Sequence, residues 1–151
     1  MGNTTGQVNS EVSRNKLHDQ IMTCVYQYLF YNKFEHEPDI EEIMTNVFVK
    51  PIDPYASEVI HVAVQHMNET KGIIEPLLNK YKFNRLDLVE QAILIVAYTE
   101  NHYAKQPKAI AINVAVKQAQ SYADPQSYKF INGVLEKICK DEWSNYSLKN
   151  Q

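Results

Sequence analysis

The residues that could support acid–base or metal chemistry are scattered along this sequence. Its five histidines, at positions 18, 36, 61, 66 and 102, include no His-Glu-x-x-His motif. His61 and His66 are five residues apart, which places them on different faces of a helix. Cys24 and Cys139 each lack a second cysteine nearby that would complete a zinc or redox pair. We therefore expect no metal site and two buried free thiols.

Motifs for nucleophilic catalysis or cofactor binding are also missing from the sequence. It has no Gly-x-Ser-x-Gly and no glycine-rich phosphate loop, and its four glycines are too few for most such loops. Glu41 and Glu42 are adjacent, so on a helix they diverge by about 100° instead of converging on a substrate. A nucleophilic Cys24 or Cys139 stays open as a third-ranked enzyme hypothesis. The sequence predicts a protein that is not an enzyme and needs no cofactor.

Aromatic and charged residues leave a binding role open. Ten tyrosines are present, and Tyr26, Tyr28 and Tyr31 cluster in one segment. Tyrosine suits both half-buried packing and stacking on unpaired bases. Residues 36–60 hold six acids and one lysine, whereas residues 101–151 hold seven lysines and four acids. An acidic middle can face a basic partner and a basic C-terminal third an anionic one, although solvation alone also explains such charges.

Apolar spacing and proline placement predict that the elements that position these residues are all helices. Leu17, Ile21, Val25 and Leu29 recur at steps of four, which predicts a helix over 14–31 with Ser13 as its N-cap. Further helices are predicted over 39–48, over 54–69 after an Asp53 cap, from about 73 to 81, over 88–100, from 107 to about 119 and over 125–138. The stretch at 88–98 has strand-like composition but no second strand to pair with, so we expect it to be a helix. Gly133, in the middle of the last helix, predicts close approach of a neighbouring helix or backbone, with a ligand role as the less favoured alternative.

The positions of the predicted helices also indicate the domain organisation. We expect a flexible N-terminal tail over 1–12, a single all-α domain over 13–143, and a C-terminal tail over 144–151. The longest purely apolar run, residues 92–98, is far shorter than the roughly 20 residues that cross a bilayer. No secretion signal is visible at the N-terminus. We expect a cytoplasmic protein that has no membrane partner.

The C-terminal half of the chain resembles one known family. Residues 112–119, Ile-Asn-Val-Ala-Val-Lys-Gln-Ala, and residues 127–138, Ser-Tyr-Lys-Phe-Ile-Asn-Gly-Val-Leu-Glu-Lys-Ile, resemble the signature region of the NusB transcription antitermination factors. Residues 89–94, followed by Ala97 and Glu100, are similar to the helix that precedes that signature. Order and spacing agree over about 88–138, which is roughly a third of the chain.

The resemblance implies a fold and a function. The fold would be a compact bundle of about seven helices in two packed halves. The family binds the boxA element of nascent RNA together with the ribosomal protein NusE and helps RNA polymerase pass terminators, notably in ribosomal RNA operons; no reaction is catalysed. The arginine-rich stretch that many relatives carry is thin here, with Arg14, Lys16 and a protonatable His18, and Ile95 stands where many relatives have an arginine.

Site residues follow from the resemblance together with side-chain chemistry. The predicted phosphate contacts are Arg14, Lys16 and Lys129, and the predicted base-stacking residues are Tyr26 and Phe130. Glu90, with the acidic 36–60 region as a second candidate, is the predicted surface for basic NusE. The alternative hypothesis is a diverged interaction module on the same fold that does not bind RNA by itself. A homodimer also stays open, because an apolar face for NusE would look the same as one for self-association.

Overall fold

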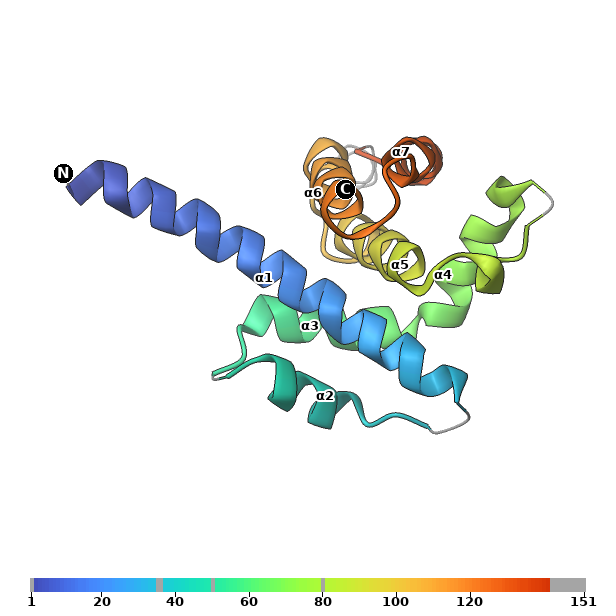
Figure 1. Ribbon diagram of the computed structural model, residues 1–151, viewed down its shortest axis with the longest axis horizontal. Coiled ribbons are helices and arrows are strands. Elements are labelled where there is room, and N and C mark those ends of the chain that lie inside the picture. Colours follow the sequence, from blue (N-terminus) through green and yellow to red (C-terminus); the bar gives the residue numbers. More distant parts are fainter. Residues whose placement is uncertain (1, 35–36, 50, 80, 142–151) are drawn as a thin grey trace, which may run out of the picture.

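A computed structural model describes residues 2–34, 37–49, 51–79 and 81–141, with side-chain surroundings from Ser13 onward. In these ranges the chain is all-helical (Figure 1), as predicted. The helices are α1 (Gly2–Lys33), α2 (Ile40–Val47), α3 (Pro54–Gln65), α4 (Met67–Ile74), α5 (Leu88–His102), α6 (Lys108–Tyr122) and α7 (Ser127–Ile138). Two short 3₁₀ helices, η1 (Glu75–Leu78) and η2 (Phe83–Arg85), connect α4 to α5.

Helix α1 begins at Gly2, so the predicted start at Arg14 and the predicted Ser13 cap are wrong. The segment before Ser13 contains no proline, and extending a helix that is already formed costs far less than nucleating one. The predicted inner face is confirmed, because Ile21, Val25 and Leu29 are buried. The tail boundaries stay predictions, and residues 144–151 lie outside the described ranges.

Helix α3 starts at the predicted Asp53 cap, and α2 starts directly after Asp39, the first residue of its predicted range. The carboxylate of Asp39 accepts the N–H of Glu41 at 3.0 Å, and that of Asp53 accepts the N–H of Ala56 at 3.0 Å. The helix predicted over 54–69 instead ends at Gln65, and α4 begins after a bend at His66. Ala63 and Met67 keep a four-residue spacing across this bend and both are buried, so apolar periodicity does not reveal it.

Helix α5 is the centre of the domain. All its residues from Gln91 to Asn101 are buried, and α5 packs against α1, α3, α4, α6 and α7. In the view of Figure 1, α2 and α3 lie on one side of α1, and α5, α6 and α7 lie on the other. The strand-like stretch 88–98 is therefore helical, and its apolar residues 92–98 are buried on every side, as expected for the middle of a bundle. No described helix is long and apolar enough to cross a membrane.

A buried polar cluster ties α1 and α3 to α5. Glu100 is 2% exposed, and one of its carboxylate oxygens accepts the Tyr55 hydroxyl at 2.6 Å. The same oxygen lies 3.4 Å from Nδ1 of His18. A carboxylate buried this deeply requires such partners, because an unpaired buried charge is costly. The cluster therefore fixes how the two halves of the bundle meet.

Candidate nucleic-acid interface

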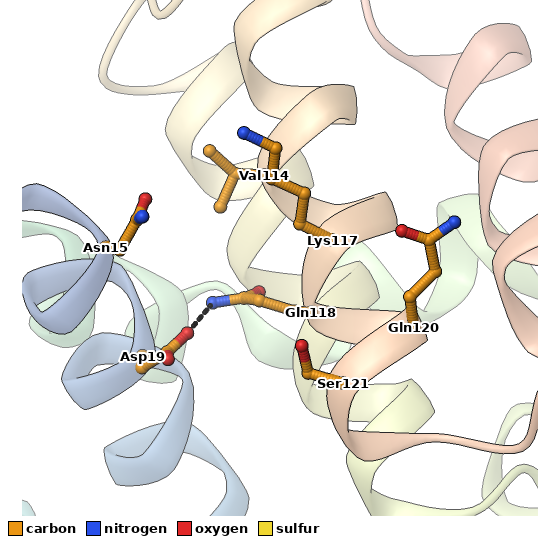
Figure 2. A pocket seen from close by; sticks show the side chains of 7 residues that line it. All are labelled: Asn15, Asp19, Val114, Lys117, Gln118, Gln120 and Ser121. Carbon is orange, nitrogen blue, oxygen red and sulfur yellow. Dashed lines mark hydrogen bonds between the residues drawn. The ribbon is translucent and has the colours of Figure 1, made fainter. Parts of the chain in front are cut away.

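A groove lies between α1 and α6, and Figure 2 shows the side chains that line it. Arg14 and Lys16 are exposed, and Asn15 between them lines the groove. The groove has a volume of about 350 Å³, and α6 contributes Lys117 to its lining. Lys117 is thus the cation that lines this groove, whereas Arg14 and Lys16 are not among its lining residues.

Asp19 fixes the relative position of α1 and α6 within this groove. Its carboxylate accepts the side-chain amide of Gln118 at 3.2 Å, drawn in Figure 2, and the hydroxyl of Tyr122 at 2.7 Å. The Gln118 amide also donates to the backbone carbonyl of His18 at 3.1 Å. Hydrogen bonding to Asp19 raises the pKa of Tyr122. The carboxylate of Asp19 is thereby hydrogen-bonded within the protein, while Arg14 and Lys16 on the same helix stay exposed.

His18 differs from its two basic neighbours. It is half-buried, and its Nδ1 lies beside Glu100. The interaction with the Glu100 carboxylate raises the pKa of His18, while burial and Arg14 oppose the rise. A protonated His18 therefore pairs inward with Glu100, and the expectation that it would add to the phosphate-binding charges is not supported by its position.

Lys129 and Phe130 line a second groove, here called the α7 groove. One wall consists of α7 residues Lys129, Phe130, Gly133, Val134 and Lys137, and the other of Leu77, Leu78, Asn79 and Tyr81. Its volume is about 330 Å³. Phe130 is half-buried, whereas Tyr81 is 69% exposed. Two cations and two aromatic rings therefore border one cavity, which is the combination that binds phosphates and unstacked bases.

The prediction of a close helix approach at Gly133 is wrong. A Cβ added to Gly133 would meet no atom within 4 Å, since the residue faces the open α7 groove. The absence of a side chain leaves space beside Phe130, at the expense of helix stability.

Tyr26 and Glu90 lie apart from these grooves. Tyr26 is half-buried against the core, twelve residues along α1 from Arg14, which corresponds to about 18 Å. Glu90 is half-buried in the first turn of α5, where its carboxylate accepts the N–H of Asp87 at 3.3 Å in a capping box. Glu90 thus has a structural role at the start of α5, and its predicted contact with a partner stays a prediction.

Sequence reasoning missed Lys117, Tyr81 and Lys137 as groove residues. A signal existed for Lys137, because Lys129, Gly133 and Lys137 follow one another at four-residue steps and share a helix face. Tyr81 had no such signal, since only the tertiary fold brings it to the groove that the α7 residues line.

The thiols behave as predicted. Cys24 and Cys139 are both buried, and burial raises the pKa of each thiol to about 12. Such thiols are protonated at neutral pH and therefore poor nucleophiles. In the described ranges, no three His, Cys, Asp or Glu residues gather closely enough to hold a metal ion.

Comparison with known proteins identifies the family. The model of the NusB family matches residues 21–140. The transcription antitermination protein NusB of Macrococcus caseolyticus is 35% identical over 119 residues, covering 77% of this chain and 91% of the relative. The NusB of Methylacidiphilum infernorum is 29% identical over 136 residues, covering 86% and 92%. The chain belongs to the NusB family of transcription antitermination factors, which are not enzymes.

Solved structures agree with this assignment. NusB of T. maritima superposes with a TM-score of 0.73 at 25% identity, covering 83% of this chain and 89% of that one. A crystal structure of the antitermination factors NusB and NusE in complex with dsRNA contains a chain that superposes with a TM-score of 0.69 at 26% identity, covering 83% and 94%. The family match begins at residue 21, so Arg14 and Lys16 lie outside it.

Proposed function

We propose that this protein is a cytoplasmic RNA-binding adaptor that binds boxA-type single-stranded RNA together with NusE. In this role it joins the RNA polymerase antitermination complex and helps the polymerase read through terminators, notably in ribosomal RNA operons. Membership of the NusB family supports the proposal, as does the solved complex of a related NusB with NusE and dsRNA.

The α7 groove is the observation that carries the RNA-binding part of the proposal. It places Lys129 and Lys137 on the same wall as Phe130, with Tyr81 opposite. An unstacked base against an aromatic ring contributes about 1–3 kcal/mol, and lysines at the groove edge can pair with the adjoining phosphates. We assign the base contact to Phe130, the predicted phosphate contacts to Arg14, Lys16 and Lys129, and a peripheral aromatic contact to Tyr26.

The acidic side chains are proposed to meet NusE. Exposed Glu42 on α2, and Glu90 at the start of α5, offer negative charge to a basic ribosomal protein. Charge complementarity of this kind raises the association rate and selects the partner more than it adds affinity. NusE bound alongside would also offset the loss of RNA affinity that results from the small number of cations on α1.

Binding of a labelled boxA RNA to single variants tests the proposed RNA surface. Phe130→Leu retains apolar bulk on α7 but removes the ring, and Lys129→Glu reverses a groove charge. We expect both to weaken RNA binding at least fivefold, while Lys140→Glu, an equal charge change at an exposed position outside the groove, has a smaller effect. Equal losses in Lys129→Glu and Lys140→Glu would mean that the effect is general charge, and unchanged binding in Phe130→Leu would exclude the stacking role.

A further inference from the structure

A cationic pocket lies at the far end of α1 from Arg14 and Lys16. It has a volume of about 540 Å³ between the last turn of α1, α4, η2 and the first turn of α5. Three separate elements each contribute a cation to its lining: Lys33 from α1, Lys71 from α4 and Arg85 from η2. We call it the α5-entry pocket. Nineteen residues of helix separate Arg14 from Lys33, which is about 28 Å.

The cations of this pocket lack acidic partners within the described part of the chain. None of the ion pairs of the described residues involves Lys33, Lys71 or Arg85. Lys71 is half-buried, its amino group lies 5.8 Å from the centroid of the Phe83 ring, and burial lowers its pKa. Asp87, the acid in the lining, forms the capping box with Glu90. Three cations around one cavity with a single engaged acid favour an anionic ligand.

Three exposed aromatic residues are close in sequence to the pocket residues Asn32 and Lys33, although they do not line the pocket itself. Phe30, Tyr31 and Phe34 are 39%, 46% and 57% exposed, and the ring centroid of Phe30 lies 5.5 Å from that of Tyr31 and 5.0 Å from that of Phe34. Phe30 precedes Lys33 by three residues, so the two occupy neighbouring positions on the surface of α1. A helix end that presents three partly solvated aromatic rings beside a cationic cavity is an interaction surface.

The chemistry of this surface selects among its potential occupants. Glu90, the proposed NusE contact, does not line this pocket. Inside the pocket a basic ribosomal protein would be repelled by Lys33, Lys71 and Arg85, and two copies of this surface would repel each other in the same way. A small anion would pair with the cations but leave the aromatic rings unused. Single-stranded nucleic acid uses both features, because its phosphates pair with cations while its bases stack on aromatic faces.

We infer that the α5-entry pocket and the Phe30–Tyr31–Phe34 cluster bind single-stranded RNA that flanks the boxA element. A phosphate occupies the pocket between Lys33, Lys71 and Arg85, and adjoining bases stack on the aromatic rings. This inference rests on the proposed RNA-binding function and extends it, since it gives the protein a second RNA contact beyond the α7 groove.

Three labelled RNAs test the inference with the full chain. They are a boxA element alone, the same element with ten unpaired nucleotides added at either end, and ten unpaired nucleotides without boxA. The variants are Lys33→Glu and Arg85→Glu, both at exposed positions, with Lys140→Glu as the matched charge control. Phe34→Ser removes one exposed ring, and circular dichroism checks the fold of each variant.

The inference predicts that at least one extension tightens binding of boxA RNA at least fivefold. Lys33→Glu and Arg85→Glu should abolish that gain, leave binding of boxA alone unchanged, and make the salt slope for extended RNA shallower by about 0.7 each. Phe34→Ser should reduce the gain, and Lys140→Glu should leave it intact.

Other outcomes distinguish the proposed boxA-binding function from the inferred second RNA contact. If boxA alone fails to bind while unpaired RNA binds through Lys33 and Arg85, the proposed function is wrong and the second surface is retained. If neither extension adds affinity, or if Lys140→Glu removes the gain equally, the inference is overturned. It is also overturned if Phe34→Ser changes the oligomeric state in sedimentation without affecting RNA, because the surface then serves self-association.

Discussion

Replacing Gly133 with alanine should make the protein more stable and a weaker RNA binder. Gly133 lies inside α7, and an added Cβ would meet no atom within 4 Å. Glycine in a helix interior is about 0.8–1.0 kcal/mol less favourable than alanine. With no clash to offset this gain, Gly133→Ala should raise the free energy of unfolding by about 1 kcal/mol and Tm by about 2–4 °C for a chain of this size.

The same methyl group would enter the α7 groove beside Phe130 and Lys129. We expect it to weaken binding of boxA RNA several-fold, because it takes space that an unstacked base would use. Gly72→Ala in α4 is the matched control: a Cβ there also meets no atom within 4 Å, and Gly72 does not line the α7 groove. Urea unfolding and RNA titration of both variants measure the two effects. Lower stability in Gly133→Ala, or equal RNA binding by both variants, would refute the reasoning.

Three further predictions concern stability and reactivity. Asp53→Ala removes the α3 cap and should lower the free energy of unfolding by about 1 kcal/mol, measured by urea denaturation; an unchanged value would mean that the cap is dispensable. Glu100 raises the pKa of His18 in the folded state, so this interaction stabilises fully below the unfolded pKa of about 6.5 and is lost as pH rises through the folded pKa. The stability advantage of the protein over His18→Gln should therefore shrink as pH rises from 5 to 8, and a constant difference would contradict this linkage. Cys24 and Cys139 should resist a thiol reagent in the native protein and react when urea unfolds it; rapid native labelling would show that a thiol is accessible.

Apolar periodicity and caps were sufficient to predict most of the fold. The stripe of Ile21, Val25 and Leu29 predicted the buried face of α1, and Asp53 with Pro54 predicted the start of α3. These signals are local and therefore readable in sequence. The N-terminal extension of α1 was not, because polar residues without proline are compatible with both helix and coil.

The candidate site was less predictable, because its grooves are built from segments far apart in the chain. Lys129 and Phe130 could be singled out on α7, but the opposite wall at Tyr81 exists only through tertiary packing. Gly133 was misread since a helical glycine is compatible with either a close contact or an open groove. His18 looked like an accessible cation because its partner, Glu100, is 82 residues away in the sequence.

Titration of labelled boxA RNA across a salt series, with and without NusE, tests the central claim most directly. With Arg14, Lys16 and Lys129 as phosphate contacts, the slope of log K against log salt should be about −2, given about −0.7 per contact to a single strand. Affinity should rise sharply when NusE is added. If no RNA binds even with NusE present while NusE itself binds the protein, the RNA-binding account is wrong and the chain is a protein-interaction module on the NusB fold.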